Sequence, residues 1–280
     1  MRLDRVAEDI FIVISEMYAQ VTAAVIFTNQ GAIVIDTLPY PAETRQMLSF
    51  IEDKLGADAV RYVVNTHCHA DHVYGSYLFE SATVISHDLC REILLRSGER
   101  LLARAQRENT NLAEVRLRPP QVTFANEMHL HLGPRHVRLI HTPGHTSDSI
   151  IAFTVDDRVV IAGDTMMPIP HISGGDITSL VASLRSIQEL NPNFIVQGHG
   201  DVLLRGEVDE AIETNICYLV TITERVRELV ERKQSLASLL SVDIEACGIS
   251  RIPLDGLVGR IHQTNLNSLY QRFTTEESAD

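Results

Sequence analysis

Three histidines and an aspartate stand close together in the stretch NTHCHADHVYG, residues 65–75. They are His67, His69, Asp71 and His72. Imidazole and carboxylate groups are ligands for zinc, iron and manganese. If the segment is extended, alternation directs the first two histidines to the same side, and the following turn brings Asp71 and His72 round to a second position. The stretch therefore predicts ligands for two neighbouring metal positions.

Three later segments add ligands of the same kinds, each after an apolar run typical of a strand. They are TPGHTSDS at 142–149, AGDT at 162–165 and QGHG at 197–200, which contribute His145, Asp164 and His199. Loops at the ends of adjacent strands converge on one point, as the ligands of a metal centre must. Five histidines and two aspartates exceed what one tetrahedral ion can use. We therefore expect two divalent metal ions as cofactors, with zinc favoured and iron or manganese as alternatives.

The segments that must position these motifs alternate between strand and helix patterns. Apolar runs at 10–14, 22–29 and 31–37 are typical of strands. Residues 41–56 have apolar side chains at helical spacing and close on a glycine. Residues 60–66 then predict a buried strand, so the histidine cluster begins where that strand ends.

The remainder of the chain continues this pattern and then becomes helical. Residues 88–114 are rich in Leu, Arg and Glu, which favours helix. A hairpin is predicted to turn at Asp156-Asp157, and 176–190 has the apolar period of an amphipathic helix. From Glu207 onward the pattern is again helical. This order predicts an α/β sandwich with a helical C-terminal appendage.

In order and spacing, the four motifs resemble the metallo-β-lactamase superfamily, whose HxHxDH signature is present at residues 67–72. The resemblance covers about residues 8–205. It implies a four-layer αββα metallo-β-lactamase sandwich with a helical C-terminal extension. On this basis we expect a catalytic domain at 1–205 and a helical extension at 206–280 that packs on it.

The resemblance also implies a role for each predicted ligand. The ligands of the first metal would be His67, His69 and His145. The ligands of the second metal would be Asp71, His72 and His199, and Asp164 would bridge the two ions. Two ions at about 3.5–4 Å lower the pKa of a shared water, so a metal-bridging hydroxide is the expected nucleophile. Asp71 is the expected catalytic residue, because a metal-bound carboxylate can orient that hydroxide and collect its proton.

These roles predict a binuclear metal-dependent hydrolase that cleaves an ester, thioester, lactone or lactam bond. Three alternatives remain open at this stage. The THCHADH string also resembles persulfide dioxygenases, in which one iron would be held by His67, His145 and Asp164. A glyoxalase II-like thioesterase shares the metal set, although its THHHWDH form matches only in part. The third alternative is a weak or promiscuous β-lactamase.

Three residues outside the motifs are candidates for a substrate pocket. Met17 and Tyr18 lie at the tip between the first two predicted strands, where several relatives have a flexible loop over the site. His171 follows the Asp164 loop closely enough to line a pocket. His129, His131, His136 and His141 lie on predicted strands away from the motifs, and we expect them to be structural.

Composition narrows the choice of partners. The formal net charge of −13 argues against binding to nucleic acid or an anionic membrane, so a small-molecule substrate is expected. No apolar run approaches the length of a membrane span, and the N-terminus lacks the pattern of a secretory signal, which together favour a cytoplasmic location. The apolar stripe of the 207–232 helix suits packing on the core or on a second copy, so a homodimer is left open.

Overall fold

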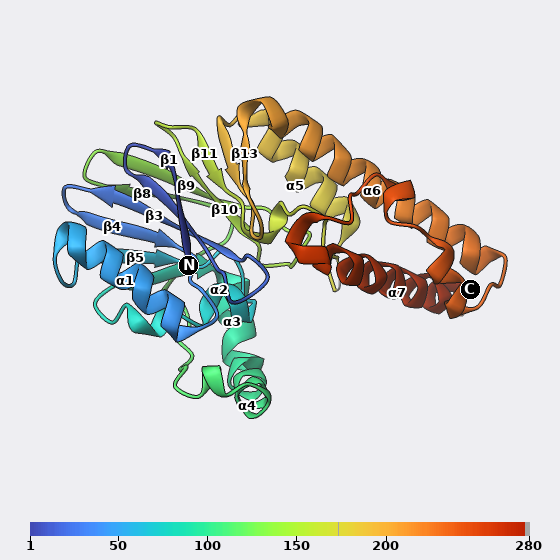
Figure 1. Cartoon of the computed structure of the whole chain (residues 1–280), viewed down its shortest axis with the longest axis horizontal. Helices are drawn as coiled ribbons and strands as arrows, with labels where there is room; N and C mark the ends of the chain where they lie inside the picture. The colour runs from blue at the N-terminus through green and yellow to red at the C-terminus, as the bar shows by residue number, and fades with distance from the viewer. Residues whose placement is uncertain (173, 278–280) are drawn as a thin grey trace.

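Two β-sheets lie face to face, and helices cover their outer faces (Figure 1). The computed structural model describes residues 1–172 and 174–277. The first sheet has seven strands in chain order. They are β1 (Arg2–Ala7), β2 (Ile10–Ile14), β3 (Thr22–Thr28), β4 (Gly31–Ile35), β5 (Val60–Val64), β6 (Thr83–His87) and β7 (Val122–Phe124). Strands β1 to β4 pair antiparallel, whereas β4 to β7 pair parallel.

The second sheet has six strands in the order β13-β12-β11-β10-β9-β8. They are β8 (Glu127–Leu132), β9 (Arg135–His141), β10 (Ile150–Thr154), β11 (Val159–Ile161), β12 (Phe194–Val196) and β13 (Val202–Leu204). The predicted hairpin at Asp156-Asp157 is confirmed, since β10 and β11 pair antiparallel across that turn. The strand at Arg2–Ala7 was not predicted, because its largely exposed, charged residues lack the apolar run of a buried strand.

Apolar side chains fill the spaces between four layers. Ile12 and Ile35 of the first sheet meet Leu139 and Ile161 of the second in one buried cluster. Helix α1 (Pro41–Leu55) covers the outer face of the first sheet through residues such as Met47. Helices α5 (Ile177–Glu189) and α6 (Arg205–Glu231) cover the outer face of the second sheet. The predicted αββα sandwich is therefore confirmed.

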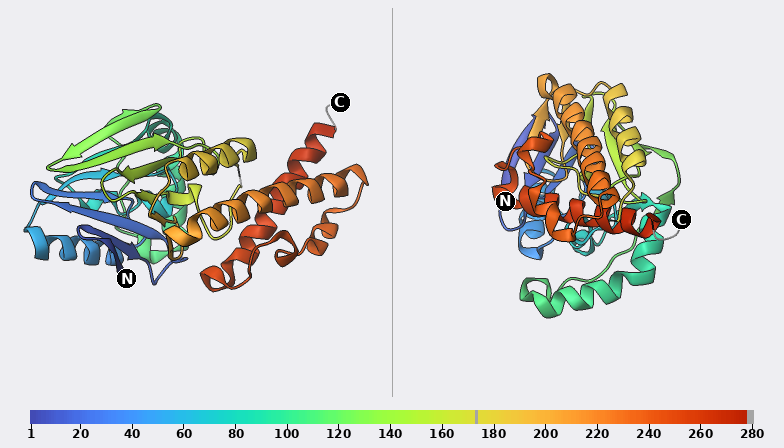
Figure 2. Two further views of the ribbon diagram at one scale, coloured as in Figure 1. Left: turned by 90° about the horizontal axis from the view of Figure 1, so that it is seen from above. Right: turned by 90° about the vertical axis from the view of Figure 1, so that its right-hand side faces the viewer.

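Helix α7 (Leu257–Glu277) runs beside α6, and the two project from the sandwich (Figure 2). Short 3₁₀ turns at Leu236–Ser241, Glu245–Cys247 and Pro253–Gly256 connect them. Side chains of both helices join the apolar cluster on the second sheet, which contains Val160 as well as Leu219 and Leu266. Helix α6 begins at Arg205, next to the predicted domain boundary at 205/206, and that boundary stays a prediction. Among the described helices, none is long and apolar enough to cross a bilayer.

The segment between β6 and β7 is helical, as predicted, but it is interrupted. It comprises α3 (Asp88–Ile93), a π-helical turn at Leu94–Gly98, α4 (Glu99–Glu108) and a 3₁₀ turn at Thr110–Leu112. Single π turns inside α-helices are frequent near functional sites. This one lies beside the end of the sandwich where the histidine motif begins.

Candidate metal centre

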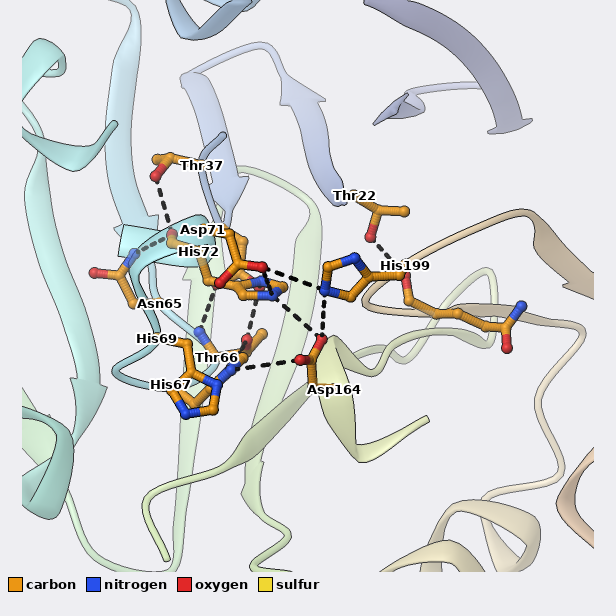
Figure 3. Close-up of polar contacts among 12 residues, drawn as sticks. Thr22, Thr37, Asn65, Thr66, His67, His69, Asp71, His72, Asp164 and His199 are labelled. Carbon is orange, nitrogen blue, oxygen red and sulfur yellow. Dashed lines mark hydrogen bonds and ion pairs between the residues drawn. The ribbon is translucent and has the colours of Figure 1, made fainter. Parts of the chain in front are cut away.

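The four predicted motifs meet at one edge of the sandwich, in the loops that follow four strands. Figure 3 shows residues of three of them, which include His67, Asp164 and His199. His67 and His69 follow β5, and the short helix α2 (Ala70–Val73) carries Asp71 and His72. The loop after β9 carries His145. A 3₁₀ turn after β11 (Gly163–Thr165) carries Asp164, and the loop after β12 carries His199.

The predicted ligands form two groups in which one donor atom from each residue lies within 4.8 Å of the others. The first group contains His67, His69, His145 and Asp164, and the second contains Asp71, His72 and His199. In the first group, Nδ1 of His69 lies 3.0 Å from Nε2 of His145. In the second, Nε2 of His199 lies 3.4 Å from Oδ2 of Asp71. All seven residues are thus brought together, and their role as metal ligands stays a prediction.

Asp164 lies between the two groups and presents one oxygen to each (Figure 3). Its Oδ2 is 3.4 Å from Nε2 of His145 and 3.8 Å from Nε2 of His67. Its Oδ1 is 3.2 Å from Nε2 of His72 and 3.5 Å from Nε2 of His199. A Cβ on Gly198 would collide with this Oδ1, so the QGHG loop needs glycine to pass so close.

Several donor atoms in the cluster are buried without a hydrogen-bond partner among the described residues. They are Nε2 of His67, Nε2 of His72 and Oδ1 of Asp164. An unpaired buried polar atom costs about 1–3 kcal/mol, more when it is charged, so native proteins rarely leave several together. Imidazole nitrogens and a carboxylate oxygen are donors that suit zinc and similar divalent ions. The residues present therefore fit a divalent cation.

Backbone carbonyls fix the orientation of two of the imidazoles. Nδ1 of His145 lies 2.7 Å from the carbonyl oxygen of His171, and Nδ1 of His199 lies 2.9 Å from that of Ala19. A carbonyl only accepts, so each Nδ1 carries the proton. In the neutral form of each ring, the lone pair is consequently on Nε2, the atom that faces Asp164.

A buried aspartate, Asp36, plays the same part for two other histidines. Its Oδ2 lies 2.8 Å from Nδ1 of His72 and accepts from the Thr66 hydroxyl at 2.6 Å, and its Oδ1 accepts from the Thr66 amide at 2.7 Å. The same hydroxyl lies 3.0 Å from Nδ1 of His67. Asp36 has a φ of 58°, a left-handed conformation that is strained for a non-glycine residue.

Asp36 is not among the site residues predicted from the sequence, although its position carries a signal. Asp36 ends the apolar run GAIVID just as Asp164 follows the run VVIAGD. An acidic residue directly after a buried strand at the same edge of the sandwich is a candidate partner for the ligands.

Burial and the neighbouring carboxylates act in opposite directions on the imidazoles. Burial lowers the pKa of His145 to about 3, against the attraction of Asp164. Burial also opposes protonation of His199, but Asp164 and Asp71 outweigh it and raise the pKa of His199 to about 10. Although burial opposes its ionisation, Asp164 has a pKa well below its usual range, because His199, His72 and His145 favour the charged form. The site therefore holds an ionised, buried carboxylate that needs positive charge beside it.

The C-terminal helices reach this centre through one side chain of α7. Nδ2 of Asn265 donates to the carbonyl of Pro170 at 2.7 Å, and its Oδ1 accepts from the amide of Ile172 at 3.0 Å. These two bonds hold the backbone on either side of His171, whose carbonyl orients His145. Asn265 is fully buried and also lies 3.2 Å from the Tyr218 hydroxyl of α6.

An apolar pocket of about 360 Å³ lies beside the donor groups. His69 and Asp71 belong both to the pocket lining and to the donor groups, so the two adjoin. Most of the remaining lining comes from α2, the π turn and the segments around it. It includes Tyr74, Ile93, Leu94, Ser97, Gly98, Leu101 and Leu117.

The three residues predicted for a substrate pocket do not line this apolar pocket. Met17 and Tyr18 are about half exposed and line a separate open pocket that contains none of the seven predicted ligands. The charge of Asp71, together with burial, raises the pKa of Tyr18 to about 12, so the electrostatic field of the centre reaches the Tyr18 hydroxyl. The ring of His171 lies 5.5 Å from that of His145. A role for these three in substrate binding stays a prediction.

The fold and the site together define an αββα protein whose His/Asp clusters suit divalent metal ions. The chain belongs to the metallo-beta-lactamase superfamily, whose family model matches residues 18–199. The resemblance proposed from the motifs is thereby confirmed.

Individual relatives are distant. A protein named "Probable metallo-hydrolase" from Methanocaldococcus jannaschii is 26% identical over 61% of this chain and 83% of its own length. A "Beta-lactamase-like protein 2 homolog" of Caenorhabditis elegans is 28% identical over 39% of this chain. The solved structure of the sec-alkylsulfatase Pisa1 from Pseudomonas sp. covers 97% of this chain with a TM-score of 0.72 at 16% identity, a likeness of fold. The chain spans 35% of the length of the C. elegans protein and 50% of the alkylsulfatase chain.

Proposed function

We propose that this protein is a binuclear metal-dependent hydrolase that cleaves an ester, thioester, lactone or lactam bond in a small molecule. One observation carries the proposal: the two oxygens of Asp164 face different imidazoles, at 3.4 Å from His145 and 3.2 Å from His72. A carboxylate between two sets of donors is suited to bridge two cations. The hydrolase-like names of two relatives support the same class of enzyme.

Each ion would have its own set of ligands. The first would be held by His67, His69 and His145, the second by Asp71, His72 and His199, and Asp164 would be shared. Zinc is favoured because imidazole dominates the donor set, while iron and manganese accept the same ligands. Two such ions, when bound, make a water nucleophilic near neutral pH and polarise the oxygen of the scissile bond.

In this proposal, Asp71 moves a proton between the centre and the substrate. It belongs to the second donor group and to the lining of the apolar pocket. Although burial opposes its ionisation, the nearby His72 and His199 hold the pKa of its carboxyl below the usual range. The ionised carboxylate can accept a hydrogen bond from the attacking water and pass the proton to the leaving group.

The apolar pocket supports a substrate with a carbon chain or ring next to the scissile bond. A polar substrate would gain little from side chains such as Leu94, Leu101 and Leu117, whereas each buried methylene group contributes about 0.8 kcal/mol. The scissile group would lie at His69 and Asp71, where the pocket meets the donor groups.

The mononuclear iron alternative uses fewer of the residues at the site. A persulfide dioxygenase-like enzyme would need only His67, His145 and Asp164. The 3.2 and 3.5 Å distances from Asp164 Oδ1 to His72 and His199 favour a second ion. The glyoxalase II-like and weak β-lactamase alternatives remain within the hydrolase class, and substrate assays separate them.

The first experiment counts zinc, iron and manganese per chain by elemental mass spectrometry in protein purified without added metal. About two ions per chain are expected, and the double variant His72→Gln/His199→Gln should retain about one. Thioesters, lactones, lactams and alkyl esters of increasing chain length form the substrate panel, with alkyl sulfates included because of the shared fold. A single iron per chain that zinc does not replace would overturn the binuclear mechanism.

A further inference from the structure

Three histidines gather on the hairpin formed by β8 and β9, in a group that shares no residue with the metal centre. His129 and His131 are two residues apart on β8, which places both on one face of the strand. The residues between and beyond them, Leu130 and Leu132, point into the core between the sheets. His136 on β9 pairs directly with His131. Strand alternation and register therefore bring three imidazoles to the outer surface of an edge hairpin.

The three rings are close enough to share one ligand. One nitrogen from each lies within 4.8 Å of the others. Nδ1 of His129 is 2.8 Å from Nε2 of His136, and the ring centroids of His131 and His136 are 4.3 Å apart.

A carboxylate orients one of these rings. Oε1 of Glu127 lies 3.2 Å from Nε2 of His129 and accepts from Nε of Arg138 at 2.6 Å. If Nε2 of His129 donates to Glu127, Nδ1 of that ring presents its lone pair to the other two histidines. A histidine that binds a metal through one ring nitrogen usually donates its other ring N–H to a carboxylate or a carbonyl oxygen.

We propose that His129, His131 and His136 form a second, surface metal site that binds a borderline divalent transition metal such as Zn²⁺ or Cu²⁺. Three imidazoles without a carboxylate ligand suit these ions and not Mg²⁺ or Ca²⁺, which need oxygen donors. A fourth position would be open to water or to another molecule. The site spans both strands, so a bound ion would tie the edge strand β8 to β9.

Equilibrium dialysis against micromolar Zn²⁺, followed by elemental mass spectrometry, tests the proposal. The triple variant His129→Gln/His131→Gln/His136→Gln should bind one ion fewer per chain than the wild type. That difference does not depend on how many ions the main centre holds, so its result is independent of whether the hydrolase proposal is correct. His141→Gln is the matched control, because His141 is also on β9 but lies 2.9 Å from the Ser147 carbonyl, and it should leave the count unchanged.

Two further measurements separate a built site from adventitious binding by surface histidines. Glu127→Gln keeps all three ligands and should weaken the extra Zn²⁺ about 10- to 100-fold. With Cu²⁺ as the probe, the difference between the electron paramagnetic resonance spectra of wild type and triple variant should show coupling to nitrogen. Equal ion counts in wild type and triple variant, or an equal loss in His141→Gln, would overturn the proposal.

Discussion

Replacing Asn265 by alanine should weaken metal binding at a centre that Asn265 does not touch. Its side chain bonds the Pro170 carbonyl and the Ile172 amide, and between them the His171 carbonyl holds Nδ1 of His145 at 2.7 Å. Without Asn265, the backbone on either side of His171 loses these two bonds to α7, although Arg272 of α7 still donates to the Gly175 carbonyl further along the loop. The His145 ring can then turn, and its Nε2 no longer points steadily at Asp164.

The structure sets the expected size of the effect. The carbonyl of Pro170 and the amide of Ile172 are on buried residues, and each costs about 1–3 kcal/mol if left unpaired. Partial relaxation of the loop reduces the sum, so we expect a loss of about 2–4 kcal/mol in the free energy of unfolding of the metal-free protein. Loss of an outer partner of a ligand histidine typically weakens metal affinity about 10- to 100-fold.

The assay combines urea unfolding of the metal-free protein with a Zn²⁺ titration in a chelator buffer. Asn215→Ala is the matched control, because Asn215 is also buried but, among the residues that the structure describes, its side chain bonds only the Ala211 carbonyl of its own helix. Tyr218→Phe removes the other partner of Asn265 without touching the loop and should leave Zn²⁺ affinity nearly unchanged. If Asn265→Ala loses stability but keeps wild-type Zn²⁺ affinity, α7 supports the fold alone and the reasoning is wrong.

Three other predictions follow from the same geometry. In Asp36→Asn, the new amide group either donates to Nδ1 of His72, which moves the proton of that ring to Nε2, or faces the amide donor of Thr66. Metal affinity should therefore fall about 10- to 100-fold in the chelator titration. The control Asp148→Asn changes a buried aspartate beside Cys68 and should not lower metal affinity. Leu117→Ala should lower kcat/KM about 10-fold for long-chain esters in a chain-length series and leave kcat/KM for acetyl esters unaffected. Equal losses for both kinds of ester would show that the pocket does not bind the substrate chain. Burial lowers the pKa of His145 to about 3 from 6.5. In the metal-free protein, the contribution of this neutral ring to stability is therefore present above pH 6.5 and is lost as the pH falls towards 3. In urea unfolding, the free energy of unfolding of the wild type should decline with falling pH by up to about 1.4 kcal/mol per pH unit more steeply than that of His145→Gln.

The sequence by itself determined the chemistry of the centre. The spacing in residues 67–72 predicts two metal positions because strand alternation and one helical turn are local geometry. The apolar runs before each motif predict strands, and the glycine after residues 41–55 predicts the end of α1, since both depend on near neighbours. Local rules therefore predict the candidate ligands of residues 67–72 and most of the elements.

Only the tertiary structure decided which residues support and surround that centre. In the sequence, Asp36 is marked only by its place after a buried strand, and Asn265 is an ordinary polar residue. They become partners of His72 and of the His145 loop through contacts 36 and 93 or more residues apart. The apolar pocket likewise combines residues from α2 with the π turn and Leu117. Single residues in such contacts carry no periodicity, because their position is set by how whole elements pack.

The tertiary structure also decides which histidines of the β8–β9 hairpin lie together. The sequence places His129 and His131 on one face, but predicts only a structural role for them. Pairing of His131 with His136 depends on the register of the hairpin, and a shift of one residue would turn His136 to the other face of the sheet. Register is fixed by the buried partners Leu130 and Val137, so the core on one face of the hairpin decides which imidazoles meet on the other.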